Sequence, residues 1–580
     1  MAFARSPIFV TWLLTTVMTF ASGGLATASP FEGSPFGPAV AASLESNEQS
    51  DVAKGNRIAL LSSGYDALLL RVHLIRQAKT SIKIQTFIWT NDECGRLLIY
   101  ELLEAARRGV KVSIIADHLF SDQNPDIVAF LATAHPNLEV KHYRPATSRM
   151  KPSLFRTLLA GLRSFRDLNQ RMHSKVMIFD DAILLTGGRN IENTYYDHSL
   201  SLNFRDRDVL VVGPVVRTAV GEFELFWKYR YAVASRDLVD VENILKKGSF
   251  KRYQVRDDYD FGPHFTALDL EANDTSLIAT RFVERLRPVD KAVFIFDAPG
   301  KSHRAAANSA RITRELAAAL EKARTSVVIQ TPYLVLSPSA RRLIREMQKK
   351  NPALQIKIST NSFASTDNVF AYSANYRLRN DYVQSLQLQV HEFKPQPKSL
   401  FTLFPRCTVM SELAREKKGS RTAAPAPFLS LHAKSLVVDD TIAFVGSYNL
   451  DPRSEGLNTE VGLLVEDSAF AQELRNEIET DMLPENSWVI ARNRLPLHLN
   501  IVNGLVDGVL SLTPLDLWPI QNTSSFELLP GASPVSPDDP EFYNRYRDVG
   551  SFPGTDGLLS QKEILTRLFK AVGSPLTPVL

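Results

Sequence analysis

Two stretches of this sequence decide its fold and its chemistry. Residues 173–190 read HSKVMIFDDAILLTGGRN, and residues 432–449 read HAKSLVVDDTIAFVGSYN. Both match the pattern H-x-K-x4-D-x6-G-x2-N. At roughly one residue in twenty for each fixed position, the pattern arises by chance about once in three million starting points. Two copies in one chain therefore indicate a duplicated functional unit.

The repeat extends well beyond these two stretches. Residues 78–86 read AKTSIKIQT and residues 323–331 read ARTSVVIQT, while VKHYRP at 140–145 is echoed by VHEFKP at 390–395. Each echo follows its first copy at a nearly constant spacing, and apolar strands alternate with amphipathic helices such as 97–108. We therefore predict an α/β fold of two homologous lobes, 52–290 and 291–490, each a mixed sheet covered by helices.

The termini and the composition narrow the protein class. One charge, Arg5, precedes an apolar stretch at 8–20 and the small residues Ala26-Thr27-Ala28, which predicts a signal peptide at 1–28 and an exported, periplasmic or secreted protein. An uncleaved membrane anchor is the alternative.

Residues 29–51 resemble a linker, and residues 491–580 form a C-terminal extension. With 67 Lys+Arg against 63 Asp+Glu, no nucleic-acid partner is expected. Cys94 and Cys407 can form at most one disulfide.

The motif residues suit a phosphodiester. Strand alternation places His173 beside Lys175, and His432 beside Lys434. Each lysine can bind phosphate oxygens, one neutral histidine can attack phosphorus, and the other can protonate the leaving oxygen. Further donors to the phosphate are expected at Gly188, Asn190, Ser447 and Asn449.

The same motif contains two aspartates, Asp180 and Asp439, which we count among the catalytic candidates. An aspartate where a strand turns back more often bonds to nearby backbone, and we favour that structural role for both. A protonated lysine cannot ligate zinc, and the chain has no H-E-x-x-H or C-x-x-C pattern. We therefore predict catalysis without a metal or another cofactor.

The paired motifs resemble those of the phospholipase D superfamily in its two-motif, single-chain form. Most similar are the bacterial C-type cardiolipin synthases, on the strength of residues 446–454 (GSYNLDPRS), 457–460 (LNTE), 187–191 (GGRNI) and 206–214 (DRDVLVVGP). The resemblance implies two lobes packed face to face around a pseudo-twofold axis. It further implies His173 as nucleophile and His432 as general acid and base. Asp208 and Glu460 are the expected orienting acids, with the pairing left open.

These features together predict phosphatidyl transfer through a phosphohistidine. The acceptor is phosphatidylglycerol in a cardiolipin synthase, or water in a hydrolytic phospholipase D that releases phosphatidic acid. A secreted phosphodiesterase or nuclease of the same superfamily is the alternative. The expected partner is a phospholipid at an anionic membrane surface, to which the protein would bind peripherally. The basic, amphipathic stretch 149–175 is one candidate contact, although it fits a core helix equally well.

Overall fold

The computed structural model describes residues 30–45, 53–119, 121–152, 169–261, 265–301, 310–418, 426–493 and 522–555. The predicted signal peptide and most of the basic amphipathic stretch lie outside these ranges. None of the helices within them combines the length and the apolar character needed to cross a bilayer. Cys94 and Cys407 are both buried and form no disulfide.

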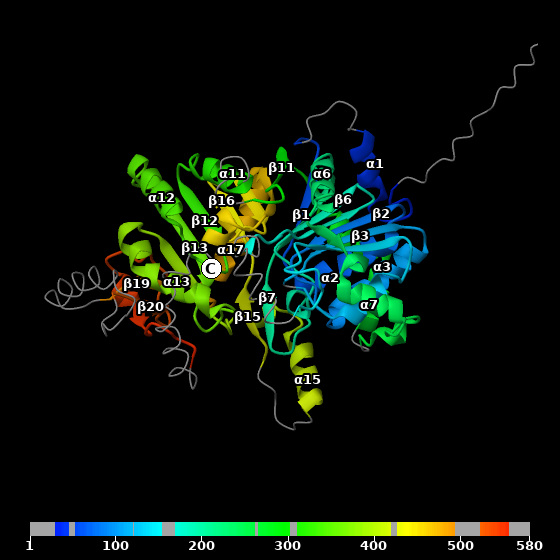
Figure 1. Cartoon of the computed structure of the whole chain (residues 1–580). Helices are drawn as coiled ribbons and strands as arrows, with labels where there is room; N and C mark the ends of the chain where they lie inside the picture. Colours follow the sequence, from blue (N-terminus) through cyan, green and yellow to red (C-terminus); the bar gives the residue numbers. More distant parts are fainter. Residues whose placement is uncertain are drawn as a thin grey trace, which may run out of the picture.

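Two large sheets form the molecule, one in each predicted half (Figure 1). In spatial order, the first sheet contains β10 (Arg287–Pro288), β1 (Arg57–Leu61), β8 (Asp208–Val212), β6 (Ile183–Gly187), β5 (Val176–Phe179), β2 (Ser81–Thr86), β3 (Lys111–Asp117), β4 (Leu138–Tyr143) and β9 (Ala232–Ala234). The second contains β11 (Lys291–Phe296), β18 (Val461–Glu466), β17 (Ile442–Gly446), β16 (Ser435–Val438), β12 (Ser326–Gln330), β13 (Gln355–Asn361), β14 (Gln389–Phe393), β19 (Ser487–Arg492), β20 (Thr523–Leu528) and β21 (Tyr546–Asp548).

The two sheets repeat the same topology. In each, three parallel strands (β2, β3 and β4, or β12, β13 and β14) are followed on one side by the antiparallel hairpin of the motif (β5–β6, or β16–β17). Even the register repeats, since Gln85 faces Val176 and Gln330 faces Ser435. This correspondence confirms the predicted α/β fold of two homologous lobes.

Helices pack against both faces of the sheets, with α6 (Val216–Trp227) and α17 (Ser468–Met482) on the inner faces. The first lobe has α1 (Gly37–Glu45), α2 (Gly64–Gln77), α3 (Glu93–Arg107), α4 (Pro125–Leu131), α6, α7 (Val239–Lys247), α8 (Thr266–Asn273) and α9 (Thr275–Ile278). The second has α11 (Arg311–Leu320), α12 (Pro338–Lys350), α13 (Val369–Asn380), α14 (Leu400–Leu403), α15 (Cys407–Lys418), α16 (Pro452–Gly456), α17 and α19 (Phe542–Arg545). The helix caps repeat as well, because Asp92 caps α3 and Ser337 caps α12 at equivalent positions.

The inner faces of the two sheets pack against each other. Ile178 and Val211 of the first sheet share one buried cluster with Val437, Val461 and Val465 of the second. Helices α6 and α17 contribute to the same cluster. A short parallel sheet also joins the lobes, with β7 (Leu202–Arg205) paired to β15 (Phe428–Leu431) at the junction in Figure 1. The lobes therefore meet face to face, as the resemblance implies.

Two boundaries differ from the sequence prediction. Within the predicted linker, helix α1 follows Phe31 and Phe36, which are fully buried in the core of the first lobe. Strands β20 and β21 come from the predicted C-terminal extension and continue the edge of the second sheet beyond β19. Both segments are thus parts of the lobes, because their aromatic side chains complete hydrophobic clusters there.

Candidate active site

His173 begins the first motif, just ahead of β5, and its backbone is bound by the opposite lobe. Its N–H donates to the carbonyl of Thr459 at 2.9 Å, and the N–H of Thr459 donates to the carbonyl of Arg171 at 2.9 Å. This short pairing brings Glu460 to the imidazole, where His173 Nδ1–H donates to Glu460 Oε2 at 2.8 Å. The carboxylate that orients the first histidine therefore belongs to the second lobe.

His432 repeats this arrangement with the lobes exchanged. Its N–H donates to the carbonyl of Arg205 at 2.9 Å, at the end of the β7–β15 pairing. His432 Nδ1–H then donates to Asp206 Oδ2 at 2.6 Å. Each imidazole is consequently held by an acid from the other lobe, and both pairs are buried.

The prediction of Asp208 as an orienting acid is wrong. Asp208 Oδ2 accepts from Arg71 Nη2 at 2.7 Å and lies 3.5 Å from Arg189 Nη1, within the first lobe. The repeat contains a signal for the correct residue. Glu460 precedes Leu463-Leu464-Val465 by three positions, and Asp206 precedes Val209-Leu210-Val211 by the same number. Strand pairing agrees, because Asp208 faces Gly187 and Gly462 faces Gly446.

The glycine and serine of the motifs support these acids. A Cβ added to Gly188 would clash with Asp206 Oδ1, so only glycine leaves room for the carboxylate. At the equivalent position, Ser447 Oγ–H donates to Glu460 Oε2 at 2.5 Å. The backbone N–H groups of Gly188 and Ser447 donate to the carbonyls of Arg207 and Val461. The predicted phosphate contacts of these two residues are thus corrected to a positioning role, since their donors are occupied.

The two motif asparagines differ in their surroundings. Asn190 Oδ1 accepts from the N–H of Ile88 at 3.2 Å, and its Nδ2 donates to Tyr195 Oη at 2.8 Å. Asn449 Oδ1 is buried with no hydrogen-bond partner among the described residues. The phosphate-binding role predicted for both amides stays a prediction.

The motif lysines lie beside the histidines, as the strand alternation predicts. Lys175 Nζ donates to the carbonyl of His173 at 2.7 Å. Lys434 Nζ donates to the carbonyl of His432 and lies 3.1 Å from His432 Nε2. Both ammonium groups are buried, and burial lowers the pKa of Lys434 to about 8 and that of Lys175 well below its ordinary value. A bound anion would relieve this cost.

The motif aspartates lie at the far end of their strands. Asp180 follows β5 and accepts from the N–H groups of Lys79, Thr80 and Ser81 at 2.8, 2.8 and 2.9 Å. Asp439 makes the same contacts with residues 324–326 at 2.7–2.9 Å. At about 3.3 Å per residue, seven residues separate Asp180 from His173 by roughly 23 Å. Their catalytic candidacy is therefore wrong, and the favoured structural role is correct.

The two imidazoles differ at Nε2. The ring of Phe87 stands edge-on to His173 at 4.7 Å between centroids, and His173 Nε2 has no hydrogen-bond partner among the described side chains. At His432, by contrast, Tyr195 O–H donates to Nε2 at 3.3 Å, in series with Asn190. Sequence reasoning missed Tyr195, which carries no motif signal. Of the two imidazoles, only that of His432 thus has a hydrogen bond at Nε2 among the described side chains.

Burial controls the protonation of both imidazoles. It lowers the pKa of His173 to about 4, against the opposing attraction of Glu460. Burial and the neighbouring Lys434 together lower the pKa of His432 to about 3. The pKa of Glu460 lies below its ordinary value because contact with His173 and Lys175 outweighs the effect of its burial. At neutral pH the site thus holds neutral imidazoles, ionised acids and cationic Lys434.

Comparisons with known proteins agree with this geometry. The family described as "Cardiolipin synthase, PLD-like domain" matches residues 72–227 and 316–482. Cardiolipin synthase C of Escherichia coli strain K12 is 28% identical over 415 residues, which cover 71% of this chain and 82% of the relative. An uncharacterized protein of Helicobacter pylori strain J99 is 30% identical over 485 residues, covering 81% of this chain and 89% of that protein.

A solved structure shares the fold. The crystal structure of phosphatidylserine synthase from Haemophilus influenzae Rd KW20 superposes with a TM-score of 0.50 at 16% identity, covering 78% of this chain and 95% of that one. Both halves of the family match carry one H-x-K motif, and together they span more than half of the sequence. The chain therefore belongs to the cardiolipin synthase-like family of phospholipase D-fold proteins.

Proposed function

We propose that this protein transfers a phosphatidyl group between alcohols through a phosphohistidine on His173, as a cardiolipin synthase-type enzyme. The crossed pairing of two histidines with two acids at the lobe interface is the observation that carries the proposal. It provides two imidazoles of fixed orientation beside two lysine side chains, the set that a double displacement at phosphorus requires. Family membership supports a phospholipid as the substrate.

In the first step, His173 Nε2 attacks the phosphorus of a donor phospholipid. The P–N bond forms as the bond from phosphorus to the headgroup oxygen breaks. His432 Nε2–H gives its proton to that oxygen, so the headgroup leaves as a neutral alcohol. Lys175 and Lys434 bind the non-bridging oxygens, on which negative charge is concentrated.

The proton on His432 is supplied when substrate binds. In the free protein, Lys434 and burial keep this imidazole neutral. A phosphodiester anion beside the two ammonium groups would raise the pKa of His432, because an opposite charge favours the cationic form. Its Nδ1–H bond to Asp206 holds Nε2 towards the substrate throughout.

The second step reverses the first with a new alcohol. The hydroxyl of the acceptor gives its proton to His432 Nε2 and attacks phosphorus, and the P–N bond to His173 breaks. Phosphatidylglycerol as acceptor yields cardiolipin, whereas water yields phosphatidic acid. We favour transfer to phosphatidylglycerol because the second motif continues as the GSYNLDPRS of C-type synthases. An anionic membrane outside the cytoplasm, with peripheral attachment, is the proposed site of action.

Lipid product analysis tests this proposal. The full-length chain is incubated with vesicles of phosphatidylglycerol and phosphatidylethanolamine, and products are identified by mass spectrometry. We expect cardiolipin from the wild type and none from His173→Ala or His432→Ala. His135→Ala is the matched control, since that ring lies in a loop and bonds only its own turn. A phosphatidyl adduct on the peptide containing His173, after alkaline quenching, would identify the nucleophile.

The other outcomes are equally informative. Phosphatidic acid without cardiolipin would make the protein a hydrolytic phospholipase D. Unchanged lipids, together with turnover of an oligonucleotide or a chromogenic diester that needs both histidines, would favour the phosphodiesterase alternative. Full lipid turnover by His173→Ala would contradict the assigned chemistry.

A further inference from the structure

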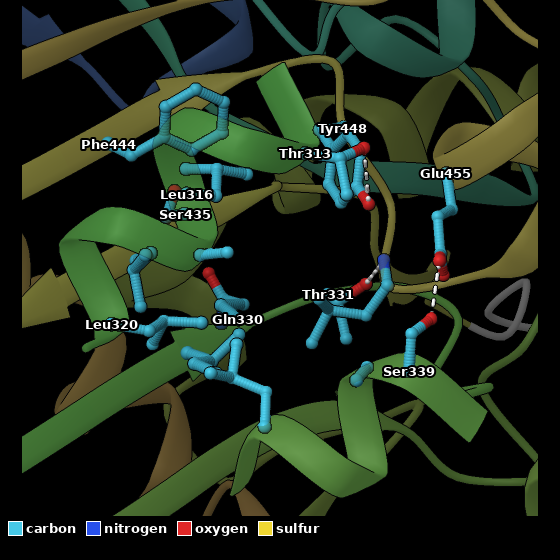
Figure 2. A pocket seen from close by; sticks show the side chains of 16 residues that line it. Thr313, Leu316, Leu320, Gln330, Thr331, Ser339, Ser435, Phe444, Tyr448 and Glu455 are labelled. Carbon is cyan, nitrogen blue, oxygen red and sulfur yellow. Dashed lines mark hydrogen bonds between the residues drawn. The ribbon is translucent and has the colours of Figure 1, made fainter. Parts of the chain in front are cut away.

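The second lobe contains a cavity that the proposed chemistry does not use. It has a volume of about 240 Å³ and lies between helices α11 and α12, above strands β12, β16 and β17. Figure 2 shows side chains from these elements surrounding an open centre. Its wall is mainly apolar, with Leu316, Leu320, Ile329, Leu343, Leu436 and Phe444. A cavity of this character suits an apolar ligand.

Polar groups gather at one side of the cavity. Thr313 Oγ1–H and Tyr448 Oη lie 3.3 Å apart, and Ser339 Oγ–H donates to Glu455 Oε1 at 2.5 Å (Figure 2). Ser339 is exposed, so this side opens to solvent. The cavity thus has an apolar interior and a polar mouth, where the Glu455 carboxylate lies.

The internal repeat supplies a control for this cavity. In the first lobe, Leu68 and Val72 of α2 occupy the positions equivalent to Thr313 and Ala317 of α11, and they are 1% and 0% exposed. Helices α2 and α3 pack directly against each other there. The smaller side chains of α11 therefore open a space that larger ones close in the other lobe.

Buried charges fill the rest of that space in the first lobe. Arg189 and Tyr196 stand where the second lobe has Tyr448 and Glu455. Arg71 binds Asp208 at 2.7 Å and lies 5.4 Å from the ring of Tyr196, and all of these side chains are buried. The second lobe has Gly462 in place of Asp208. The space beside α2 in the first lobe is thus filled by side chains, whereas the equivalent space beside α11 is open.

The shape of the cavity favours a linear ligand. Thr313, Ala317 and Leu320 lie on one face of α11, and the seven helical steps from Thr313 to Leu320 span about 10 Å at 1.5 Å per residue. Ala340 and Leu343 line the opposite side on α12. An apolar cavity between two helices admits a hydrocarbon chain, while the polar groups at its mouth suit a polar head outside it.

We propose that this cavity binds one hydrocarbon chain of a lipid. Tyr448 lines the cavity and lies between Ser447 and Asn449 of the second motif. A bound chain would therefore contact the segment that ends this motif. The proposal adds a lipid site to the proposed function without resting on its chemistry, because no motif histidine or lysine lines the cavity. The chain can come from a free fatty acid or from a phospholipid in a bilayer.

Direct binding tests the proposal. The full-length chain carrying His173→Ala, which cannot turn lipid over, is titrated with a fluorescent polyene fatty acid. A second arm uses phosphatidylglycerol vesicles with one pyrene-labelled chain, so the two arms distinguish the sources. We expect one fatty acid bound per chain. The substitutions Thr313→Leu and Ala317→Val, which introduce the side chains of the first lobe, should weaken binding by about tenfold or more because they fill the cavity.

Ala318→Val is the matched control, since Ala318 is exposed on the same helix and does not line the cavity. It should bind like the parent. Each single substitution is measured beside the double variant, and thermal unfolding verifies that all are folded. Equal binding by all variants would overturn the proposal, as would an absence of binding to the parent. Lipid turnover is measured separately in the same cavity variants carrying wild-type His173. Failure of the cavity proposal can therefore be distinguished from failure of the proposed reaction.

Discussion

At the scale of single residues, the site depends on an exchange between the lobes. His173 is oriented by Glu460 and His432 by Asp206, and neither acid lies in the same lobe as its histidine. In each case an ionised carboxylate fixes the proton on Nδ1 and leaves Nε2 for chemistry. Asp206 and Asp208 are two positions apart in the chain, yet the first serves the active site and the second serves the core of its own lobe.

We therefore expect Asp206→Asn and Asp208→Asn to differ in their effect on activity. Asp206→Asn should lower kcat roughly a thousandfold, because the amide no longer holds the tautomer of His432. Asp208→Asn should leave kcat within about tenfold but cost about 3–5 kcal/mol of stability, because buried Arg71 loses its ionic partner. Steady-state kinetics and urea unfolding measure both. Equal loss of activity in the two variants would contradict the assignment.

At the scale of elements, the motif hairpins are organised by pairs of aspartates. Asp180 and Asp181 have φ of 49° and 54°, and Asp439 and Asp440 have φ of 50° and 54°. Two consecutive left-handed residues are typical of the type I′ turn, whose twist matches that of the strands. The first aspartate of each pair also accepts three backbone N–H groups at the start of the neighbouring strand. The motif aspartate thus joins β5 to β2, and β16 to β12.

A comparison within one turn tests this role. Asp180→Ala should lower the free energy of unfolding by about 3–5 kcal/mol, because three N–H groups and the Thr80 hydroxyl lose a charged acceptor. Asp181→Ala introduces the same residue at an equally left-handed position, but removes only a half-exposed ion pair with Lys83. Both variants share the cost of placing alanine at a left-handed position. Apart from that cost, the control should lose about 1 kcal/mol or less of unfolding free energy. Both should keep kcat once folded; a large loss of kcat confined to Asp180→Ala would restore its catalytic candidacy.

At the scale of the whole molecule, the two lobes are joined by a buried polar contact that the repeat does not duplicate. Asp481 of α17 accepts from Arg205 at 2.5 Å, Arg207 at 3.2 Å and Gln330 at 2.9 Å. The two arginines flank Asp206, so this contact also holds the acid of His432. At the equivalent place, Glu222 of α6 accepts from Gln85 at 3.1 Å and meets no cation among the described residues. Burial there raises the pKa of Glu222 to about 8.

Replacing each carboxyl by an amide should separate these two environments. Asp481→Asn should destabilise the protein by about 3–5 kcal/mol at pH 7 and lower activity, because two buried guanidinium groups lose their partner. Glu222→Gln should instead stabilise it at about pH 8 and leave stability unchanged near pH 4.5. The raised pKa means that the folded state keeps a proton which the unfolded chain releases above about 4.5, so wild-type stability falls as pH rises through this window. Urea unfolding at both pH values measures the difference; a destabilised Glu222→Gln at the higher pH would contradict the burial argument.

The duplicated unit, the two α/β lobes, both His-Lys pairs and the turn role of Asp180 and Asp439 can all be predicted without a structure. These follow from local patterns, since strand alternation and turn chemistry act over a few residues. The three-dimensional packing was needed to show that Asp206, and not Asp208, meets a histidine, that Gly188 makes room for Asp206, and that Tyr195 contacts His432. Those contacts form across the lobe interface, where position depends on how two sheets pack. The cavity beside α11 has the same origin, because it results from a difference in packing between two lobes whose patterns are alike.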